Sequence, residues 1–321
     1  MDTPMDAPDT PAQVTSALLE RFIAIVEAGS LNKAALRLGM SQPAMTRSLQ
    51  VLEQAYGAEL LQRGTSGVVL TAFGEVVLRR AKLIQAELRH IANDVNALRN
   101  LSIGRVHVGV PIGIGFTSVV LPSVSLRLLT ESARLEISYS IGAGRDLIAS
   151  LRRGDLDFVI SDIDDGQYED DLIQEELFFD RGAVVVRRDH PLARQRSFEL
   201  GDLTAFPWTV LAESAPLEST LRVALAKAKQ PFERSVLRSN SALFVKSTIS
   251  RGDVIGLVSL DAVRVELDGG GLVEITARAP ALNALIPSRA LGLIRRREGL
   301  PSTAANVLIK ELQRECRELR H

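Results

Sequence analysis

The stretch SLNKAALRLGMSQPAMTRSLQVLEQAY, residues 30–56, predicts two short helices joined by a tight turn. Apolar residues recur at helical spacing in each half, and Gly39 between them can adopt the left-handed backbone conformation that the turn needs. Ser30 and Ser41 stand where the two helices would begin, and a serine hydroxyl there can accept a free backbone N–H. Pro43, in the first turn of the second helix, costs that helix no hydrogen bond, because backbone N–H groups of the first turn have no partner within the helix. The pattern is typical of a helix-turn-helix, a structure that reads DNA.

The second predicted helix has two different faces. Its inward face is expected to consist of Ala44, Leu49, Leu52 and Tyr56. The opposite face carries amide, hydroxyl and guanidinium groups, which reach base edges and phosphates. The residues of this region expected to contact DNA are Ser41, Gln42, Pro43, Thr46, Arg47 and Gln50. The alternative, an ordinary corner in a helical bundle, would need neither this polar face nor the β-hairpin that residues 60–70 predict after it.

The same stretch resembles the DNA-binding domain of LysR-type transcriptional regulators. The resemblance rests on Ala34-Ala35, Leu38, Ser41-Gln42-Pro43-Ala44 and Leu52-Glu53, and it continues through LLQR at 60–63 and VLTAFG at 69–74. It covers roughly residues 13–315 and implies a winged helix-turn-helix, a long linker helix and a C-terminal, periplasmic-binding-protein-like effector domain of two α/β subdomains. Many members carry a second basic residue in the wing. Here the wing is RGTSG at 63–67, so its contact with DNA would depend on Arg63 alone.

The resemblance also implies a function. It predicts a sequence-specific, DNA-binding transcriptional regulator controlled by a small-molecule effector bound between the two α/β subdomains. The expected partners are double-stranded promoter DNA with inverted-repeat sites, the effector, and further copies of the chain in a dimer of dimers, a homotetramer. RNA polymerase is a further candidate partner, and no membrane partner is expected.

The charge distribution fits DNA binding although the formal net charge is −1. Residues 17–100 contain ten Lys and Arg against seven Asp and Glu, whereas residues 101–321 contain 28 against 29. The positive field therefore lies in the segment with the helix-turn-helix, where it can attract phosphates. Because the excess is small, we expect modest non-specific affinity per subunit and binding as an oligomer.

Other classes of protein find little support. No run approaches the ~18 apolar residues of a membrane helix, and the N-terminal MDTPMDAPDTPAQ lacks the basic and hydrophobic stretches of a signal peptide. The one cysteine, Cys316, excludes a disulfide framework, and the four histidines are too scattered to suggest a metal site. We therefore expect a cytoplasmic protein without metal or cofactor.

Two alternatives to a regulated DNA binder can be weighed. For an enzyme, Gly113-Ile114-Gly115 is a partial dinucleotide-binding pattern, but Ser118 replaces its third glycine, and the chain has no G-x-S-x-G nucleophile elbow. The acidic cluster Asp162, Asp164 and Asp165 is most simply a solvated loop, so no catalysis is expected. A purely architectural DNA binder would not need the large α/β region that follows residue 101.

The chain divides into four parts in this interpretation. They are a disordered tail at 1–12, a winged helix-turn-helix at 13–71, a linker and dimerisation helix at 72–101, and an effector domain at 102–321. The linker helix carries a heptad-like apolar seam typical of a dimer interface, formed by Val77, Ala81, Ile84, Leu88, Ile91, Val95 and Leu98. The alternative is that this seam packs on its own domain.

In the effector domain, strand-like segments alternate with helical ones, which predicts parallel sheets covered by helices. Expected strands of the first unit lie at 106–110, 135–139 and 156–160. A second unit, at about 176–265, has expected strands at 183–187, 208–211, 236–239 and 254–259. The return of the chain to the first unit falls somewhere between 262 and 296.

Ligands of open α/β sheets bind beyond the carboxyl ends of the strands, where helix N-termini present free N–H groups. The loops that begin at Pro111, Gly142, Ala212 and Asn240 occupy such places. By resemblance to the family, the expected effector-binding residues are Gly113, Ile114, Thr117, Ala143, Gly144, Arg145, Ser214, Ala215 and Asn240. The alternative is that these are only turn and cap residues, since glycine, serine and asparagine serve in turns without any ligand.

Overall fold

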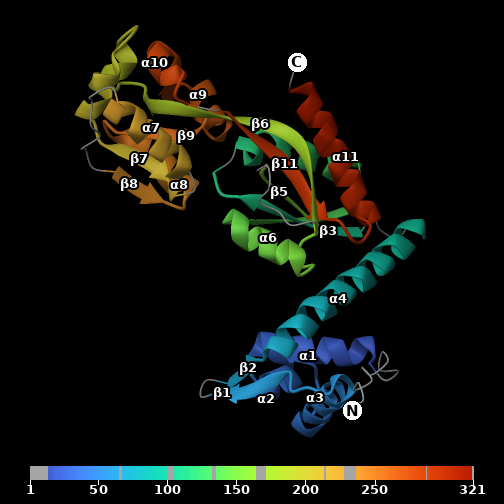
Figure 1. Ribbon diagram of the computed structural model, residues 1–321. Coiled ribbons are helices and arrows are strands. Elements are labelled where there is room, and N and C mark those ends of the chain that lie inside the picture. The colour runs from blue at the N-terminus through green and yellow to red at the C-terminus, as the bar shows by residue number, and fades with distance from the viewer. Residues whose placement is uncertain are drawn as a thin grey trace, which may run out of the picture. The chain divides into compact units, whose positions relative to one another are not determined.

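The computed structural model describes residues 14–64, 67–99, 104–113, 115–131, 135–163, 171–212, 215–227, 236–286 and 288–319. The predicted tail at 1–12 lies outside these residues. The chain divides into two compact units at Ala92–Asn93, inside one long helix, with the turn 152–155 grouped in the first unit (Figure 1). Each unit is described by itself. No helix among the described residues is long and apolar enough to cross a membrane.

The first unit contains a winged helix-turn-helix, as the sequence predicts. Its elements are α1 (Ser16–Ala28), α2 (Leu31–Arg37), α3 (Gln42–Tyr56), the hairpin of β1 (Leu61–Gly64) and β2 (Gly67–Leu70), and α4 (Ala72–Leu98). Phe22 of α1 packs with Leu52 of α3, and Ile25 of α1 packs with Ala34 of α2 and Met45 of α3, all at most 1% exposed. Three short helices can therefore share one core.

Local details of the helix-turn-helix agree only partly with the prediction. Ser41 caps α3 by accepting the Ala44 N–H on its Oγ at 3.4 Å, and Gly39 has a left-handed φ of 63°. Ser30 has extended N-cap geometry but makes no side-chain cap hydrogen bond. Tyr56 was expected to face inward, yet it is 38% exposed, because the last turn of α3 runs beyond the three-helix core.

The apolar seam of α4 divides into two parts. Val77 and Ala81 pack into the core of the winged helix-turn-helix, as the own-domain alternative predicts. The seam residues further along are 40–86% exposed, namely Ile84, Leu88, Ile91, Val95 and Leu98. The first part of the seam therefore fixes α4 to its own domain, and the second part is left without a partner in the described residues of the monomer.

The second unit contains a nine-stranded mixed sheet shared by two lobes, with the strand order β4-β3-β5-β11-β6-β9-β7-β8 and β10 (Leu272–Glu274) paired to β6. Lobe I has the parallel strands β3 (Gly104–Pro111), β4 (Leu135–Gly142) and β5 (Phe158–Asp162). Lobe II has the parallel strands β7 (Trp208–Leu211), β8 (Val236–Ser239) and β9 (Ile255–Ser259). Two antiparallel strands join the lobes, β6 (Leu172–Arg187) and β11 (Ser288–Arg296).

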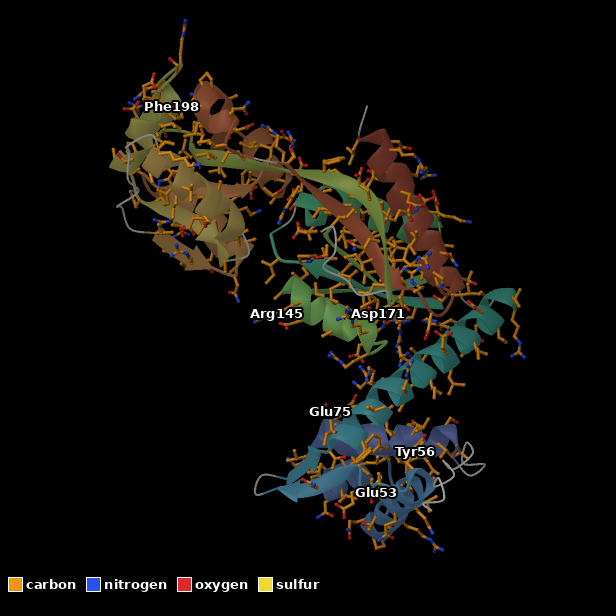
Figure 2. The ribbon with its side chains drawn as sticks, viewed as in Figure 1. Glu53, Tyr56, Glu75, Arg145, Asp171 and Phe198 are labelled. Atoms are coloured by element: carbon orange, nitrogen blue, oxygen red, sulfur yellow. The ribbon has the colours of Figure 1, made fainter. Side chains whose placement is uncertain are left out.

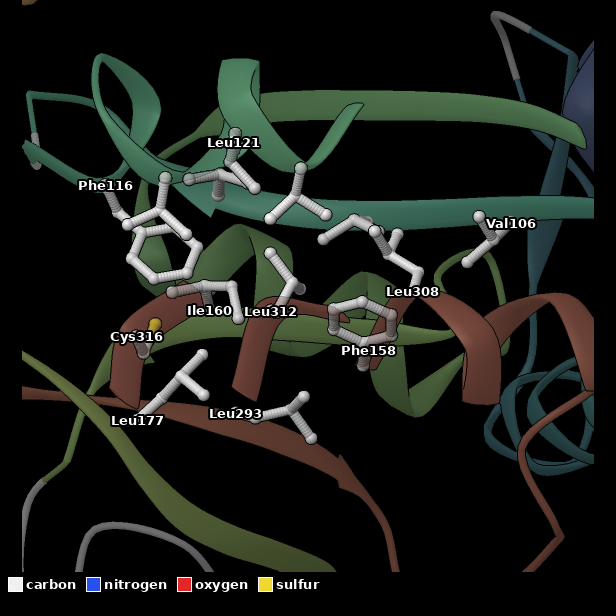
Figure 3. Packing of buried hydrophobic residues seen from close by; sticks show 14 of the residues in the cluster. Val106, Phe116, Leu121, Phe158, Ile160, Leu177, Leu293, Leu308, Leu312 and Cys316 are labelled. Carbon is white, nitrogen blue, oxygen red and sulfur yellow. The ribbon is translucent and has the colours of Figure 1, made fainter. Parts of the chain in front are cut away.

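Helices cover both faces of the sheet in each lobe. In lobe I, α5 (Val120–Glu131) and α11 (Thr303–Glu318) cover one face, where Phe116, Phe158 and Leu308 belong to the main core (Figure 3), and α6 (Gly144–Arg152) covers the other. In lobe II, α7 (Ala215–Lys227) and α8 (Ala242–Arg251) lie on opposite faces. Short elements complete the fold, namely η1 (Gly115–Thr117), η2 (Pro191–Arg194), η3 (Leu200–Ala205), η5 (Asp261–Val263), α9 (Arg264–Asp268), η6 (Thr276–Arg278) and α10 (Pro280–Asn283).

The chain passes between the lobes near residue 181, a few residues after the predicted limit of about 176, and again near residue 288, which lies within the predicted return range of 262–296 but beyond the approximate limit of 265. The chain enters lobe II along β6, whose pairing changes from β11 to β9 at Arg181–Gly182. It returns along β11, which begins at Ser288. β6 runs from one lobe into the other without a turn, so no turn residues in the sequence mark the boundary. The elements between residues 262 and 287 are too short to show the apolar periodicity of a helix or strand.

A buried histidine in lobe II makes stability depend on pH. His190 is fully buried, accepts the Leu192 N–H on Nδ1 at 3.1 Å and contacts the Phe206 ring. Burial lowers the pKa of His190; the charge of Asp253 raises it by a smaller amount, and the charge of Arg187 lowers it further. The unfolded chain then takes up the proton first, so stability should fall as the pH drops below the ordinary histidine pKa of about 6.5.

We expect the melting temperature to fall more between pH 7.5 and pH 5.5 in the wild type than in His190→Asn. Asparagine can still accept the Leu192 N–H but does not titrate in this range, so the comparison isolates the proton. Thermal unfolding at both pH values measures the difference. Equal losses in the two proteins would show that His190 is not the responsible group.

Candidate DNA interface and effector loops

The outward face of α3 carries the side chains that the sequence assigns to DNA contact. Gln42, Arg47 and Gln50 are exposed, as are Ser41 and Pro43 at the start of the helix. Thr46 is half-buried and accepts a hydrogen bond on Oγ1 from Gln42 Nε2 at 3.0 Å. This exposed face combines amide groups, which can pair with base edges, with one guanidinium, which can bind a guanine edge or a phosphate.

Polar contacts hold α3 against its neighbours. Arg21 of α1 donates from Nη1 to Ser48 Oγ at 2.9 Å, and Ser48 Oγ donates to the Ala44 carbonyl at 2.9 Å. Ser48 is 6% exposed, so this bond ties α1 to the buried side of the reading helix. Neither Arg21 nor Ser48 was predicted from the sequence. A serine among apolar inward positions was the available signal, but its partner lies 27 residues away.

The wing is attached to both ends of the helix-turn-helix. Glu53 of α3, marked in Figure 2, accepts the backbone N–H of Leu60 at 2.9 Å on Oε1. Gly67 of β2 lies so close to the α1–α2 turn that a Cβ there would stand 2.4 Å from the Gly29 carbonyl oxygen. Arg63 lies on β1, opposite Val68, but its side chain is outside the described part of the structure, so its DNA contact stays a prediction.

Most of the predicted effector residues lie at the carboxyl ends of parallel strands. Gly113 and Thr117 follow β3, Ala143 precedes α6, and Asn240 lies between β8 and α8. Gly144 and Arg145 are the first two residues of α6, and Ala215 is the first residue of α7. Ile114 and Ser214 fall outside the described residues. The topology therefore brings the described members to the strand ends of the two lobes, and their contact with an effector stays a prediction.

The strand ends of the two lobes meet directly where Gly113 lies against Leu211. A Cβ on Gly113 would lie 2.3 Å from Cδ1 of Leu211, the last residue of β7. Gly113 also has a φ of 77°, a conformation that side chains rarely adopt. Two constraints therefore favour glycine at this position, and neither of them requires a ligand.

The start of α6 is polar and lies near a buried hydroxyl. Asp146 and Leu147 both donate their N–H to the Ala143 carbonyl, at 3.0 and 3.1 Å. Arg145, labelled in Figure 2, has a side chain that is 90% exposed, and its Nε lies 3.8 Å from Asp146 Oδ1. A Cβ on Gly144 would lie 3.4 Å from Oγ of the buried Ser161 on β5. An anion could therefore approach this helix start, where the macrodipole is positive.

In lobe II, some polar groups of the loop between β8 and α8 are already hydrogen-bonded within the chain. Ser241 accepts the Phe244 N–H on Oγ at 3.2 Å, and its own N–H donates to Ser239 Oγ at 3.1 Å. Asn240 is exposed beside them. The hydroxyl groups serve as caps, in agreement with the turn-and-cap alternative, whereas the contact of the exposed Asn240 side chain with an effector stays a prediction.

A winged helix-turn-helix combined with a two-lobed α/β domain defines a DNA-binding regulator with a ligand-binding domain. Residues 17–75 match the family described as "Bacterial regulatory helix-turn-helix protein, lysR family", and residues 99–317 match the "LysR substrate binding domain". The second match covers more than half of the chain. The chain therefore belongs to the LysR family of DNA-binding transcriptional regulators with an effector-binding domain.

Individual relatives and structures agree with this assignment. The chain is 28% identical over 292 residues to the HTH-type transcriptional regulator GalR of Pseudomonas putida, covering 91% of this chain and 71% of the relative. It is 29% identical over 246 residues to the regulator GbpR of Rhizobium radiobacter, covering 76% and 80%. Full-length LysG from Corynebacterium glutamicum with bound effector Arg has the same fold, with a TM-score of 0.65, 19% identity and coverage of 95% and 99%. These relatives are regulators and not enzymes.

Replacing Arg47 with Ala should weaken binding to the native operator by about tenfold or more, because a guanidinium contact with DNA is lost. Arg47 is exposed and distant from the core residues of α3, so the fold should survive. Gel-shift titration measures the affinity, and its salt dependence distinguishes a phosphate contact from a base contact.

Arg79→Ala is the matched control. It removes the same charge from an exposed position of α4, outside the reading helix. If Arg47→Ala binds the operator within about twofold of the wild type, or no worse than Arg79→Ala, α3 does not use Arg47 to read DNA.

Proposed function

We propose that the regulator acts in the cytoplasm and inserts α3 into the major groove of promoter DNA. The contacts would come from Ser41, Gln42, Pro43, Thr46, Arg47, Gln50 and, in the wing, Arg63. The exposed polar face of α3, supported from behind by the Arg21–Ser48 bond, is the observation that favours this arrangement. Two such helices in a symmetric dimer would recognise an inverted repeat with half-sites ~10 bp apart.

We propose further that the chain assembles through α4. Five exposed seam residues are more apolar surface than a helix normally leaves in water. Beside them α1 and α4 form a hollow of about 280 Å³, whose lining includes Leu19, Ala81, Ile84 and Leu88. Side chains of a second α4 could occupy this hollow in a homodimer, and two dimers would form the tetramer that the family resemblance implies.

The double variant Ile84→Glu, Ile91→Glu should form an assembly of lower mass than the wild type in light scattering, because charges would replace apolar contacts in the seam. These side chains are 46% and 59% exposed in the monomer, so the fold itself should tolerate them. Arg79→Glu adds negative charge at an exposed polar position of the same helix and should leave the mass unchanged. An unchanged mass in the double variant would refute an interface at this seam.

For the effector, we propose a small molecule that binds between the lobes and changes how they are arranged. The meeting of the strand ends of both lobes at Gly113 and Leu211 is the observation that supports this, because a ligand bound beside this contact would touch both lobes. The contacts would come from Gly113, Ile114, Thr117, Ala143, Gly144, Arg145, Ser214, Ala215 and Asn240. A tenfold preference for one arrangement corresponds to about 1.4 kcal/mol of coupling, which is enough to alter promoter occupancy.

Gly144→Trp should abolish the transcriptional response while operator binding persists, because the indole would fill the space at the start of α6. Gly144→Ala is the control, since its Cβ would lie 3.4 Å from Ser161 Oγ and needs only a small adjustment. A promoter-reporter strain grown on a panel of metabolites measures the response, and gel shift measures binding. A wild-type dose response in Gly144→Trp would place the sensor elsewhere.

A further inference from the structure

A buried carboxylate lies where β6 passes from one lobe to the other. Asp180 is only 2% exposed. It lies at the end of the part of β6 that pairs with β11, opposite Arg289 and two residues before the part that pairs with β9 begins at Gly182. A buried charge is costly unless it is paired and hydrogen-bonded, so the partners of this carboxylate indicate its role.

Four hydrogen bonds converge on Asp180. Its Oδ2 accepts from Nε and Nη2 of Arg289, at 2.9 and 2.8 Å. Its Oδ1 accepts the backbone N–H of Gly115 at 3.2 Å and the hydroxyl of Ser259 at 2.5 Å. Arg289 also forms an ion pair from Nη1 to Oδ1 of Asp162 at 3.3 Å. We call these five residues the Asp180 cluster.

The cluster joins all parts of the two-lobed domain. Gly115 follows β3 and Asp162 ends β5 in lobe I, and Ser259 ends β9 of lobe II. Asp180 and Arg289 lie on the two joining strands and face each other in register across the β6–β11 ladder. A movement of one lobe relative to the other must therefore stretch or break bonds to this one carboxylate.

The loop that Asp180 holds reaches from lobe I onto lobe II at two points. Gly113 touches Leu211, as described above. A Cβ on Gly115 would lie 2.4 Å from Asp261 Cβ and 2.7 Å from Ser259 Oγ, so the backbone of Gly115 lies directly against the end of β9 and η5. At both points the space between the lobes is too small for one methyl group.

We propose that Asp180 is a positioning residue that holds the β3–η1 loop across the two lobes and so sets their arrangement. The inference rests on the proposed effector function, because this loop contributes Gly113 and Thr117 to the proposed effector site. A ligand that displaces the loop would pull the Gly115 N–H away from Asp180 and free the lobes to rotate about β6 and β11. Occupancy of the site would thereby be converted into a change of lobe angle.

Two substitutions can disturb the Asp180 cluster in different ways, one at the carboxylate and one at the loop that it holds. Asp180→Asn keeps the size of the side chain, but its NH₂ must face either the Arg289 guanidinium or the Gly115 and Ser259 donors, so at least one pair of donors loses its acceptor. Gly115→Ala leaves the carboxylate intact and pushes the loop away from Asp261 and Ser259. If the cluster sets the arrangement, both changes should have the same effect.

The test measures the distance between the lobes. In a Cys316→Ala background, Lys310→Cys in α11 and Lys227→Cys in α7 supply two exposed sites for spin labels. Electron–electron double resonance between the labels then measures the distance between the lobes. Dilution with excess unlabelled protein confines the signal to one chain. We expect Asp180→Asn and Gly115→Ala each to shift the ratio of two distance populations by about tenfold, the effect of losing a charged hydrogen bond.

Thr209→Val is the matched control, because it removes a fully buried lobe II hydroxyl that has no hydrogen-bond partner in the described structure. Wild-type distances in both Asp180→Asn and Gly115→Ala would overturn the proposal, as would an equal shift in Thr209→Val. If Asp180→Asn does not fold, Ser259→Ala, which removes one donor, replaces it and should give a smaller shift in the same direction. The measurement uses neither DNA nor effector, so its failure is distinct from a failure of the proposed regulator function.

Discussion

The two lobes of the effector domain share one sheet, because β6 pairs with β11 on the side of lobe I and with β9 in lobe II. The ladder between β6 and β11 runs from Ser288↔Arg181 to Arg296↔Leu172, with a register shift near Leu291. A slip along it would reverse the facing of every side chain, so the lobes can move by bending or twisting the strand pair but not by sliding. The loops at the strand ends therefore keep the same opposite neighbours while the distance between them varies, which suits a site that senses a ligand by closure.

The DNA-binding unit depends on a different principle, a small core supplemented by a few polar bonds. Five short elements and the first turns of α4 bury little apolar area, and the hydrogen bonds Arg21–Ser48 and Glu53–Leu60 help to fix the angles between them. The first part of the α4 seam completes this core through Val77 and Ala81. One helix thus stabilises its own domain with its first turns and offers a surface for association with the turns that follow.

Local periodicity predicted the helix-turn-helix, the wing and the alternating α/β elements, because each of these is specified within about 15 residues of sequence. Tyr56 was misplaced because the pattern of a helix does not show where the core beneath it ends. The joining strands were found only in part, since β6 crosses between lobes with no sign except Asp180 and Arg181 interrupting an apolar run. The candidate loops could be predicted from parallel topology, but their contacts with Leu211, Ser259 and Asp261 could not, because those residues come from the opposite lobe, far away in sequence.

The close approach of Gly67 to Gly29 has a consequence for the DNA. Val68 donates its N–H to the Gly29 carbonyl at 3.2 Å, so the wing is bonded to the turn between α1 and α2, the helix that leads into the reading helix α3. The spacing between wing and α3 is therefore fixed by backbone contacts, and the protein presents a stiff template. The DNA duplex must therefore change shape more than the protein does when the two bind. Operators with easily deformed base steps between the wing and helix contacts should bind at a smaller cost in elastic energy than operators with stiff steps there.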